Sequence, residues 1–384
     1  MTDKKTIKRS YIMKKQKIID GHIHFQNIDK MEKAVKTMDK LGFEKTCCMS
    51  LINTDRVNFN PEELYFKSKY PKRVYICGAS DYTKLLKRSA GAAKDLEDQI
   101  ELLRAAGFDG VKIITGKPSY YKFTNTPFDD KIFSGFFKRL EKTGFPLLFH
   151  VGDPAEYWQP DDAFSNLRGW NYTKGGFVTF PELLRQVEAV LKKNPKLTVI
   201  FAHFMFLAGN LERVEGYFKK YPNMCVDMTP GTELYYKLSE NPKKAREFFI
   251  KWQDRILYGT DLFYTGGPVP SKKEKFEDLT ERNAEILAGL KEFFATDKEL
   301  KLFKKSDLKV YNISLAAPIK GIKLPKKVLD KIFFRNFERI YGKTPVGINR
   351  EKALEIIESV KANAKKTPMN ARTLNRIIKH FSNC

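Results

Sequence analysis

The chain has 384 residues, of which 42% are hydrophobic and 13% aromatic, and its formal net charge is +24 at pH 7. This composition supplies enough apolar side chains for a large core and excludes a generally disordered chain. No run of residues approaches the roughly 18 consecutive apolar positions of a membrane-spanning helix, and the basic start of the chain lacks the apolar stretch of a secretory signal. We therefore expect a folded protein of the cytoplasm without a membrane partner.

The excess of basic residues raises nucleic acid as a partner. The first 17 residues contribute +6 and residues 346–384 contribute +5, so the excess is spread along the chain and not gathered in one stripe. The sequence has no zinc-finger spacing, and Gly342-Lys343-Thr344 lacks the first glycine of a phosphate-binding loop because Phe337 stands there. We expect a small-molecule ligand in preference to nucleic acid, and a preference for anionic substrates would account for the charge.

Eight short apolar runs follow one another with the character of buried parallel strands. They cover residues 17–24, 44–51, 73–78, 110–114, 146–150, 197–203, 224–228 and 256–261. Helical patterns lie between them, at 30–41, 93–106, 131–142, 180–193, 211–221 and 243–252. Gly42, Gly107 and Gly144 each follow such a helix, where a left-handed cap is favoured. Eight strands alternating with helices predict an α/β fold of the (β/α)8 TIM-barrel type.

Histidines and one aspartate lie at the carboxyl ends of several of these predicted strands. Four of the five histidines of the chain belong to this set, which consists of His22, His24, His150, His203 and, in Gly259-Thr260-Asp261, Asp261. Side chains alternate between the two faces of a strand, so His22 and His24 point the same way and can bind one cation. Active sites of such barrels form at the carboxyl ends of the strands. The pattern predicts a metal site there.

This ordered set resembles the amidohydrolase superfamily of metal-dependent barrels, and within it the amidohydrolase-related group, which contains hydrolases and nonoxidative decarboxylases. The resemblance covers most of residues 17–342. It implies that His22, His24, His150 and Asp261 hold a divalent metal and that His203 hydrogen-bonds the attacking water or the substrate oxyanion. In members with two ions, His150 and His203 would serve the second one. Imidazoles with a carboxylate favour Zn²⁺, with Mn²⁺ and Fe²⁺ as alternatives.

Lys112 also has a chemical role under this resemblance, and Asp261 has a second one. Lys112 stands where the family often carries a lysine or glutamate on the fourth strand, and three roles remain open for it: a carbamylated bridge between two metals, an unmodified cation that faces the substrate, or a packing residue inside the barrel. Asp261 can also take the proton of a metal-activated water and pass it to the leaving group, so we expect Asp261 and His203 to be the catalytic residues.

The segment that follows His150 is the longest loop at this end of the predicted barrel. It spans residues 151–178 and contains a pair of glycines at 175 and 176. Its composition is typical of a lid that moves over a substrate. We expect it to supply substrate-binding side chains, namely Trp158, Arg168, Trp170 and Tyr172. A rigid excursion packed over the barrel rim is the alternative.

The chain divides into a basic N-terminal extension (1–16), the barrel (17–345) and a C-terminal helical extension (346–384). Within the barrel segment, residues 262–330 are long for one connection and contain a charged helical pattern near 272–294, while residues 328–341 resemble the closing helix of the family. Apolar residues beyond Gly342 recur at helical spacing. They predict two amphipathic helices, packed on the barrel or on a partner subunit of a homo-oligomer.

The sequence favours a metal-dependent hydrolase in which a metal-activated water attacks an amide, lactone or ester of a small molecule. The alternative within the same family is a nonoxidative decarboxylase or hydratase of a small carboxylic acid. From another class, an inactive basic barrel that serves in binding is the third hypothesis.

Overall fold

The protein is described by a computed structural model over residues 16–162, 165–166, 169–230, 232–263, 286–287, 289–302 and 318–383. Its centre is a parallel sheet of nine strands in the order β10-β9-β8-β7-β6-β5-β2-β1-β11. The strands are β1 (Ile19–His24), β2 (Lys45–Met49), β5 (Val74–Gly78), β6 (Gly110–Gly116), β7 (Leu147–Val151), β8 (Val199–Phe201), β9 (Met224–Asp227), β10 (Ile256–Leu257) and β11 (Leu262–Phe263).

The two edges of this sheet are neighbours in the chain, and this closes it into a barrel. β10 pairs with β9 through Ile256 and Val226, whereas β11 pairs with β1 through Leu262 and Ile23. The backbone N–H of Asp261 donates to the carbonyl of His22 at 2.8 Å. β10 and β11 therefore form one interrupted eighth strand, and the predicted (β/α)8 barrel is confirmed.

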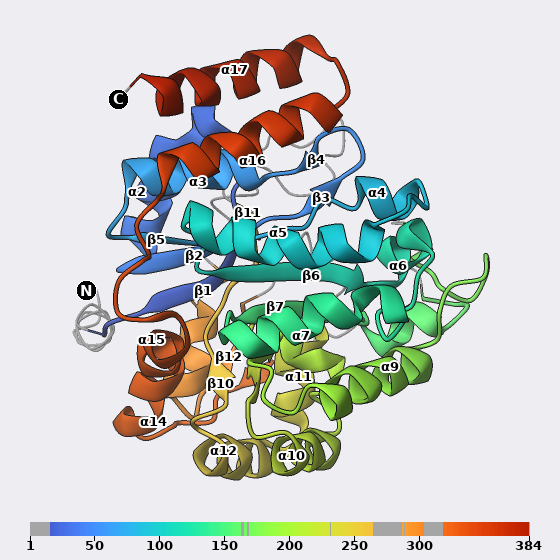
Figure 1. Cartoon of the computed structure of the whole chain (residues 1–384). Coiled ribbons are helices and arrows are strands. Elements are labelled where there is room, and N and C mark those ends of the chain that lie inside the picture. The colour runs from blue at the N-terminus through green and yellow to red at the C-terminus, as the bar shows by residue number, and fades with distance from the viewer. Residues whose placement is uncertain are drawn as a thin grey trace.

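Helices surround the barrel (Figure 1). The longer ones after the strands are α2 (Met31–Leu41), α3 (Asn60–Lys69), α5 (Ala92–Ala106), α7 (Ser134–Thr143), α9 (Phe180–Lys193), α10 (Leu211–Lys220), α11 (Thr232–Glu240) and α12 (Pro242–Lys251). The shorter ones are α4 (Thr83–Leu86), α6 (Pro118–Thr124), α14 (Lys326–Asp330) and α15 (Asn336–Tyr341), with a π-helical turn at Lys331–Arg335. Two small antiparallel pairs complete the fold, β3 (Ile52–Asn53) with β4 (Val57–Asn58) and β12 (Glu299–Leu300) with β13 (Ile319–Lys320).

The predicted elements match the observed ones, with differences at their ends. β8 ends at Phe201 and not at His203, because residues 202–206 leave the strand in a left-handed turn. Helices α3, α4, α6 and α11 and the β3–β4 hairpin fall outside the predicted elements, and α3 has no amphipathic period because it is buried along most of its length. The predicted N-terminal extension, apart from Gln16, and most of the predicted charged helix near 272–294 lie outside the described residues.

The last two helices, α16 (Arg350–Asn363) and α17 (Pro368–Ser382), are the amphipathic pair expected beyond Gly342. They pack on each other and on α3 and α5 (Figure 1). They also contact the loops after β1, β2 and β5. Arg376 pairs with Asp29, the backbone N–H of Lys365 donates to the carbonyl of Asp55 at 2.8 Å, and Asn363 Nδ2 donates to Asp81 Oδ2 at 3.0 Å. The boundaries of the three predicted segments stay predictions.

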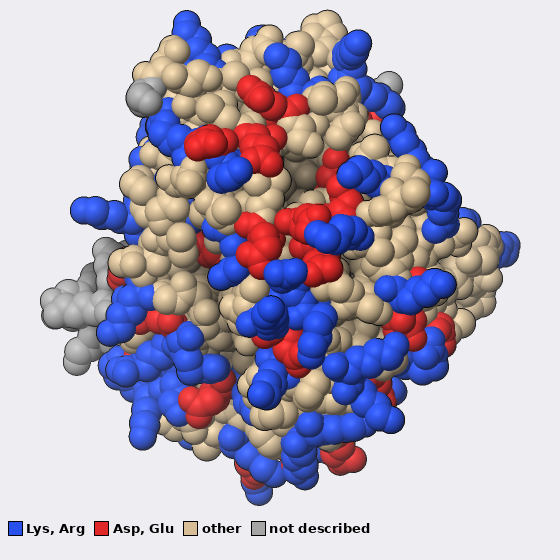
Figure 2. Space-filling view, in the orientation of Figure 1, with Lys and Arg blue, Asp and Glu red and all other residues tan. Residues whose placement is uncertain are grey.

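Basic side chains are dense on the lower part of the face in Figure 2, where α10 and α12 lie. Several are paired with acids of a neighbouring helix, such as Lys244 with Glu212 at 2.9 Å and Lys251 with Glu215 at 2.8 Å. Ion pairs of this kind are typical of a solvated helix surface. Within the described part of the chain, no helix has the length and apolar character that a bilayer crossing requires.

A buried ion pair ties α3 to the barrel. Lys67 Nζ lies 2.6 Å from Asp109 Oδ2 and donates to the carbonyl of Gly107 at 2.7 Å, and the side chains of Lys67 and Asp109 are 1% and 0% exposed. Asp109 also accepts the backbone N–H groups of Ile76 and Val346, so it joins the barrel to the segment that leads into α16.

We predict that Lys67→Met destabilises the protein by about 3–5 kcal/mol, because it leaves the carboxylate of Asp109 buried without a counter-charge. A fall in the midpoint of thermal unfolding, followed by circular dichroism, checks this. Lys84→Met, which removes an exposed partner of Asp95, is the matched control and should leave the midpoint nearly unchanged. Equal midpoints for the two variants would contradict the prediction.

Candidate functional site

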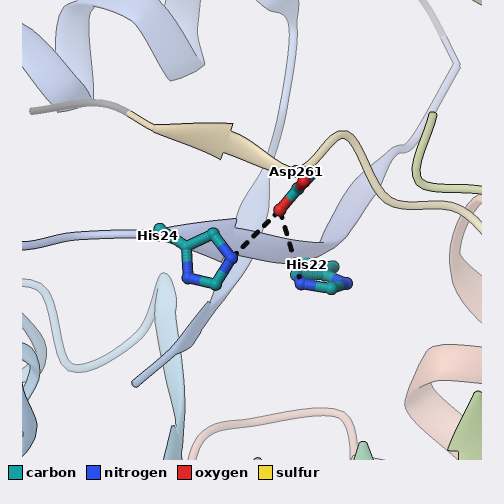
Figure 3. A group of neighbouring side chains, drawn as sticks. All are labelled: His22, His24 and Asp261. Carbon is teal, nitrogen blue, oxygen red and sulfur yellow. Dashed lines mark ion pairs between the residues drawn. The ribbon is translucent and has the colours of Figure 1, made fainter. Parts of the chain in front are cut away.

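Three of the predicted metal ligands lie together at the carboxyl ends of β1 and β10. One ring nitrogen each of His22 and His24 and one carboxylate oxygen of Asp261 all lie within 4.8 Å of one another. Asp261 Oδ1 is 3.0 Å from His24 Nε2 and 3.6 Å from His22 Nε2 (Figure 3). Two imidazole nitrogens and one carboxylate oxygen are donors that suit a divalent cation, so these residues fit the metal that the sequence predicts.

Hydrogen bonds on the far side of each imidazole fix which nitrogen faces Asp261. His24 Nδ1 lies 2.7 Å from the carbonyl of Met49, and His22 Nδ1 lies 2.8 Å from Asp227 Oδ2. Carbonyl and carboxylate oxygens only accept, so both Nδ1 atoms donate to these partners, and in a metal complex both Nε2 atoms would present a lone pair to the cation. Sequence reasoning missed Asp227, although an acid that ends a predicted strand at 224–228 was a usable signal.

Asp20 holds the turn that carries Asp261. Its Oδ2 accepts from Thr260 Oγ1 at 2.6 Å and its Oδ1 from the backbone N–H of Thr260 at 3.0 Å. Gly259 is needed in this turn, because a Cβ there would lie 2.7 Å from Thr229 Cγ2 and 3.0 Å from the Cβ of His22. Asp261 itself has a left-handed φ of 56°. Burial raises the pKa of Asp261, but the hydrogen bond and charge of His24 outweigh it and leave the pKa below its usual range.

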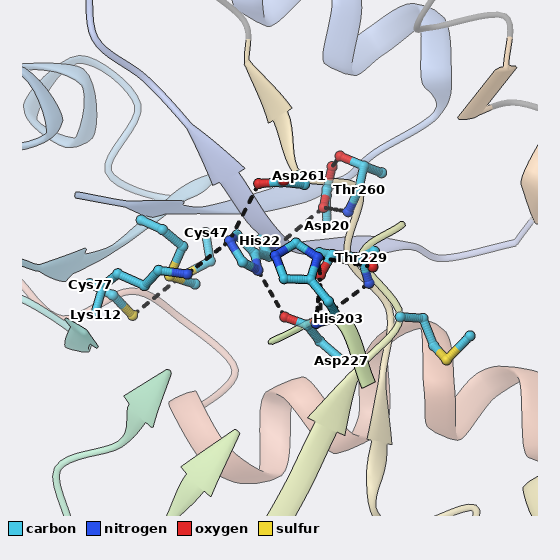
Figure 4. A network of polar contacts seen from close by, with 12 residues as sticks. Asp20, His22, Cys47, Cys77, Lys112, His203, Asp227, Thr229, Thr260 and Asp261 are labelled. Atoms are coloured by element: carbon cyan, nitrogen blue, oxygen red, sulfur yellow. Dashed lines mark hydrogen bonds and ion pairs between the residues drawn. The ribbon is translucent and has the colours of Figure 1, made fainter. Parts of the chain in front are cut away.

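Lys112 projects from β6 into this site. Its Nζ lies 3.2 Å from His22 Nε2, and the residue is 3% exposed (Figure 4). Burial lowers the pKa of Lys112 to about 8. The amine thus faces the same lone pair of His22 that a bound cation would use. Its role as a bridge, a substrate-facing cation or a packing residue stays a prediction.

His203 lies beside the three-residue group and is carried by an unusual turn. Residues 203–206 all have φ of 54–55°, and a left-handed conformation costs non-glycine residues roughly 1–2 kcal/mol each. The backbone N–H of His203 donates to Asp227 Oδ1 at 2.8 Å, and its ring centroid is 5.7 Å from that of His22. Burial lowers the pKa of His203 to about 4, so the imidazole is neutral near pH 7. A catalytic role for His203 stays a prediction.

His150 is near this group but does not join it. Its ring centroid lies 4.8 Å from that of His203, while its Nε2 lies 3.0 Å from the carbonyl of Gly152 and 3.6 Å from Asp153 Oδ1. Burial lowers the pKa of His150. Because the carbonyl requires a proton on Nε2, only Nδ1 has a lone pair in this arrangement. Metal ligation by His150 stays a prediction that would use Nδ1 or require the ring to turn.

Asp153, which the sequence reasoning missed, joins the loop after β7 to α6. Lys117 Nζ lies 2.5 and 2.7 Å from its two carboxylate oxygens, and the hydroxyl of Tyr172 donates to Oδ2. Burial would raise the pKa of Asp153, but the charge of Lys117 outweighs this and lowers the pKa to about 2. The available signal for this ion pair was Lys117, which follows the predicted strand 110–114.

The predicted lid residues lie around this ion pair. The Trp170 ring is 4.9 Å from Lys117 Nζ, and Trp158 packs against Tyr172 with ring centroids 5.0 Å apart. Arg168 lies outside the described residues. Tyr172 and Trp170 therefore reach the root of the loop beside His150, whereas Trp158 packs within the loop. Substrate contact by any of the four stays a prediction.

The family model described as Amidohydrolase matches residues 89–343. Since this is more than half of the 384 residues, the chain belongs to the amidohydrolase family. The resemblance stated from the histidines and Asp261 is confirmed. No curated protein matches the chain.

Several solved structures are similar in fold. A 2,6-dihydroxybenzoate decarboxylase from Rhizobium has 15% identity and a TM-score of 0.47, with 85% of this chain and 98% of that chain covered. A 5-carboxyvanillate decarboxylase from Novosphingobium aromaticivorans with bound manganese has 16% identity and a TM-score of 0.47, with 85% of this chain and 96% of that chain covered. A putative amidohydrolase from Staphylococcus aureus has 16% identity and a TM-score of 0.45, with 85% of this chain and 99% of that chain covered. No activity follows for this chain at such identities.

We predict that His22→Ala and Asp261→Asn each lower the affinity for Zn²⁺ or Mn²⁺ more than tenfold with the fold retained, because the first removes one donor atom of a three-residue group and the second replaces its charged carboxylate by a neutral amide. Elemental analysis after dialysis against a defined free-metal concentration, with circular dichroism for the fold, checks this. His380→Ala, in α17, is the matched histidine control and should keep its metal. Full metal occupancy in either site variant would remove that residue from the ligand set.

Proposed function

We propose that this chain is a divalent-metal-dependent enzyme that removes carbon dioxide, without an oxidant, from a small aromatic or unsaturated carboxylic acid. The observation that carries the proposal is the position of the Lys112 amine, 3.2 Å from His22 Nε2 and beside the group formed with His24 and Asp261. A metal and a lysine on one side of a buried site form a receptor for a carboxylate.

The walls of the site favour a planar substrate. The ring of Phe263 lies 4.4 Å from that of His24, and the ring of Phe206 stacks on His203 at 5.1 Å. Both phenyl rings are only partly buried, so their remaining surface is available at the barrel mouth. Aromatic rings beside His24 and His203 suit an aromatic or conjugated acid, since flat rings stack on one another favourably.

Decarboxylation breaks the bond between the carboxyl carbon and its neighbour, leaves the electron pair on that neighbour, and requires one proton there. A divalent cation held by His22, His24 and Asp261 would bind substrate oxygens and withdraw electron density from this bond. Lys112 would hold the carboxylate, while Asp261 and His203 would relay the proton from water to the carbon that carried the carboxyl group. The site is buried, with His22 0%, Lys112 3% and His203 5% exposed, and exclusion of water favours the change from a charged carboxylate to neutral carbon dioxide.

The experiment incubates the Mn²⁺- or Zn²⁺-loaded protein with aromatic acids and, separately, with an aryl ester and a lactone. The 2,6-dihydroxybenzoate and 5-carboxyvanillate named in the similar structures are the first acids to test. We expect released carbon dioxide and the matching arene, with the ester and lactone unchanged and Asp261→Asn inactive.

Hydrolysis, which the sequence favoured, stays the competing prediction. Cleavage of the ester or lactone with all acids unchanged would overturn the decarboxylase proposal in its favour. A metal-loaded protein that converts none of a broad panel of acids, esters, lactones and amides would instead support the third hypothesis, an inactive barrel.

Lys112→Met tests the carboxylate receptor directly. Loss of a hydrogen bond to a charged group costs about 1.5–3 kcal/mol, so we expect kcat/KM for the acid to fall about 10–100-fold. Metal content should stay unchanged, because in this proposal Lys112 is not a ligand. Loss of bound metal together with activity would contradict that role and indicate that Lys112 bridges metal ions.

A further inference from the structure

We infer that Asp227 is a positioning residue that sets the metal-binding tautomer of His22 and, with its other oxygen, fastens the left-handed turn of His203. The inference shares with the proposed function only the cation at His22, His24 and Asp261, and it is independent of the reaction catalysed.

The two carboxylate oxygens of Asp227 accept hydrogen bonds from different parts of the site. Oδ2 lies 2.8 Å from His22 Nδ1. Oδ1 accepts three donors: the backbone N–H of His203 at 2.8 Å, the backbone N–H of Thr229 at 3.1 Å, and the hydroxyl of Thr229 (Figure 4). The side chain is 2% exposed, so water does not compete for these contacts. Each oxygen is therefore committed to one task.

The three donors at Oδ1 make the consequence of an amide substitution unambiguous. In Asp227→Asn the carbonyl oxygen must stay at the Oδ1 position, because backbone N–H groups cannot face an amide nitrogen. The NH₂ group then faces His22 Nδ1, which can only accept from it. His22 must therefore carry its proton on Nε2, and the lone pair that now faces Asp261 and Lys112 disappears.

The second part concerns the strained backbone. Residues 203–206 hold left-handed φ angles of 54–55° without a glycine, and this arrangement needs compensating contacts. Asp227 Oδ1 and Thr229 Oγ1 both accept from the N–H of His203, at 2.8 and 3.1 Å, at the first residue of the turn. The same carboxylate thus places His203 and the Phe206 ring stacked on it relative to His22. A single side chain of β9 sets two neighbouring parts of the site.

The test compares Asp227→Asn with Thr229→Val, which removes the hydroxyl that donates to Oδ1 and accepts from the N–H of His203 but leaves the Oδ2 contact with His22 intact. Mn²⁺ affinity is measured by titration of the full-length, metal-free protein. Losing the orienting partner of a ligating histidine lowers metal affinity about 10–100-fold, which we expect for Asp227→Asn. Thr229→Val should lower the unfolding midpoint and bind Mn²⁺ within about threefold of the unmodified protein, because the partner of His22 is unchanged.

A second measurement keeps the inference falsifiable if Asp227→Asn does not fold. Imidazole ¹H–¹⁵N correlation spectra of the metal-free protein, labelled at its five histidines, report the tautomer of His22, with His22→Ala supplying the assignment. We expect Nδ1–H in the unmodified protein and Nε2–H in Asp227→Asn. An Nε2–H tautomer in the unmodified protein, unchanged Mn²⁺ affinity in Asp227→Asn, or equal losses in both variants would overturn the inference. None of these readouts depends on decarboxylation.

Discussion

Closure of the barrel between its first and eighth strands is the constraint on which the site depends. His22 and His24 are near the start of the chain and Asp261 is far along it, and they meet because Asp20 hydrogen-bonds Thr260 while the carbonyl of His22 accepts the N–H of Asp261. The eighth strand is interrupted at this point. The interruption turns the Asp261 carboxylate toward the imidazoles, where an unbroken strand would keep the residue in extended pairing with its neighbours.

Burial of the site is energetically unfavourable by itself, since a cluster of ionisable groups lies within the apolar interior of the protein. Burial lowers the pKa of His22, His150 and His203. The Nδ1 atoms of His24 and His22 have fixed acceptors in the carbonyl of Met49 and the carboxylate of Asp227. The charges of Lys112 and Asp261 flank the place where a cation and an anionic substrate would compensate them. Ligand orientation is therefore built in before any ligand binds.

The fold could be predicted from the sequence because buried parallel strands are nearly continuous apolar runs, and eight of them alternate with helices that end at glycines such as Gly107. The grouping of three predicted metal ligands could be anticipated, because closure of the barrel brings His22, His24 and Asp261 together. The remaining site residues could not be placed. His150 turns toward Gly152, and His203 sits on a left-handed turn, and neither follows from strand periodicity. Asp227, which contacts His22 from 205 residues away in the chain, was missed although it ends a predicted strand.

The terminal helices have a mechanical consequence for the barrel mouth. Arg376, Lys365 and Asn363 clasp Asp29, Asp55 and Asp81, which stand on three successive loops at the rim. One side of the rim is thus held by the C-terminal helices, whereas the other side bears the long segment after β7. Opening and closing motions of the mouth should therefore be asymmetric. The side held by the terminal helices should stay in place while the loop on the opposite side moves.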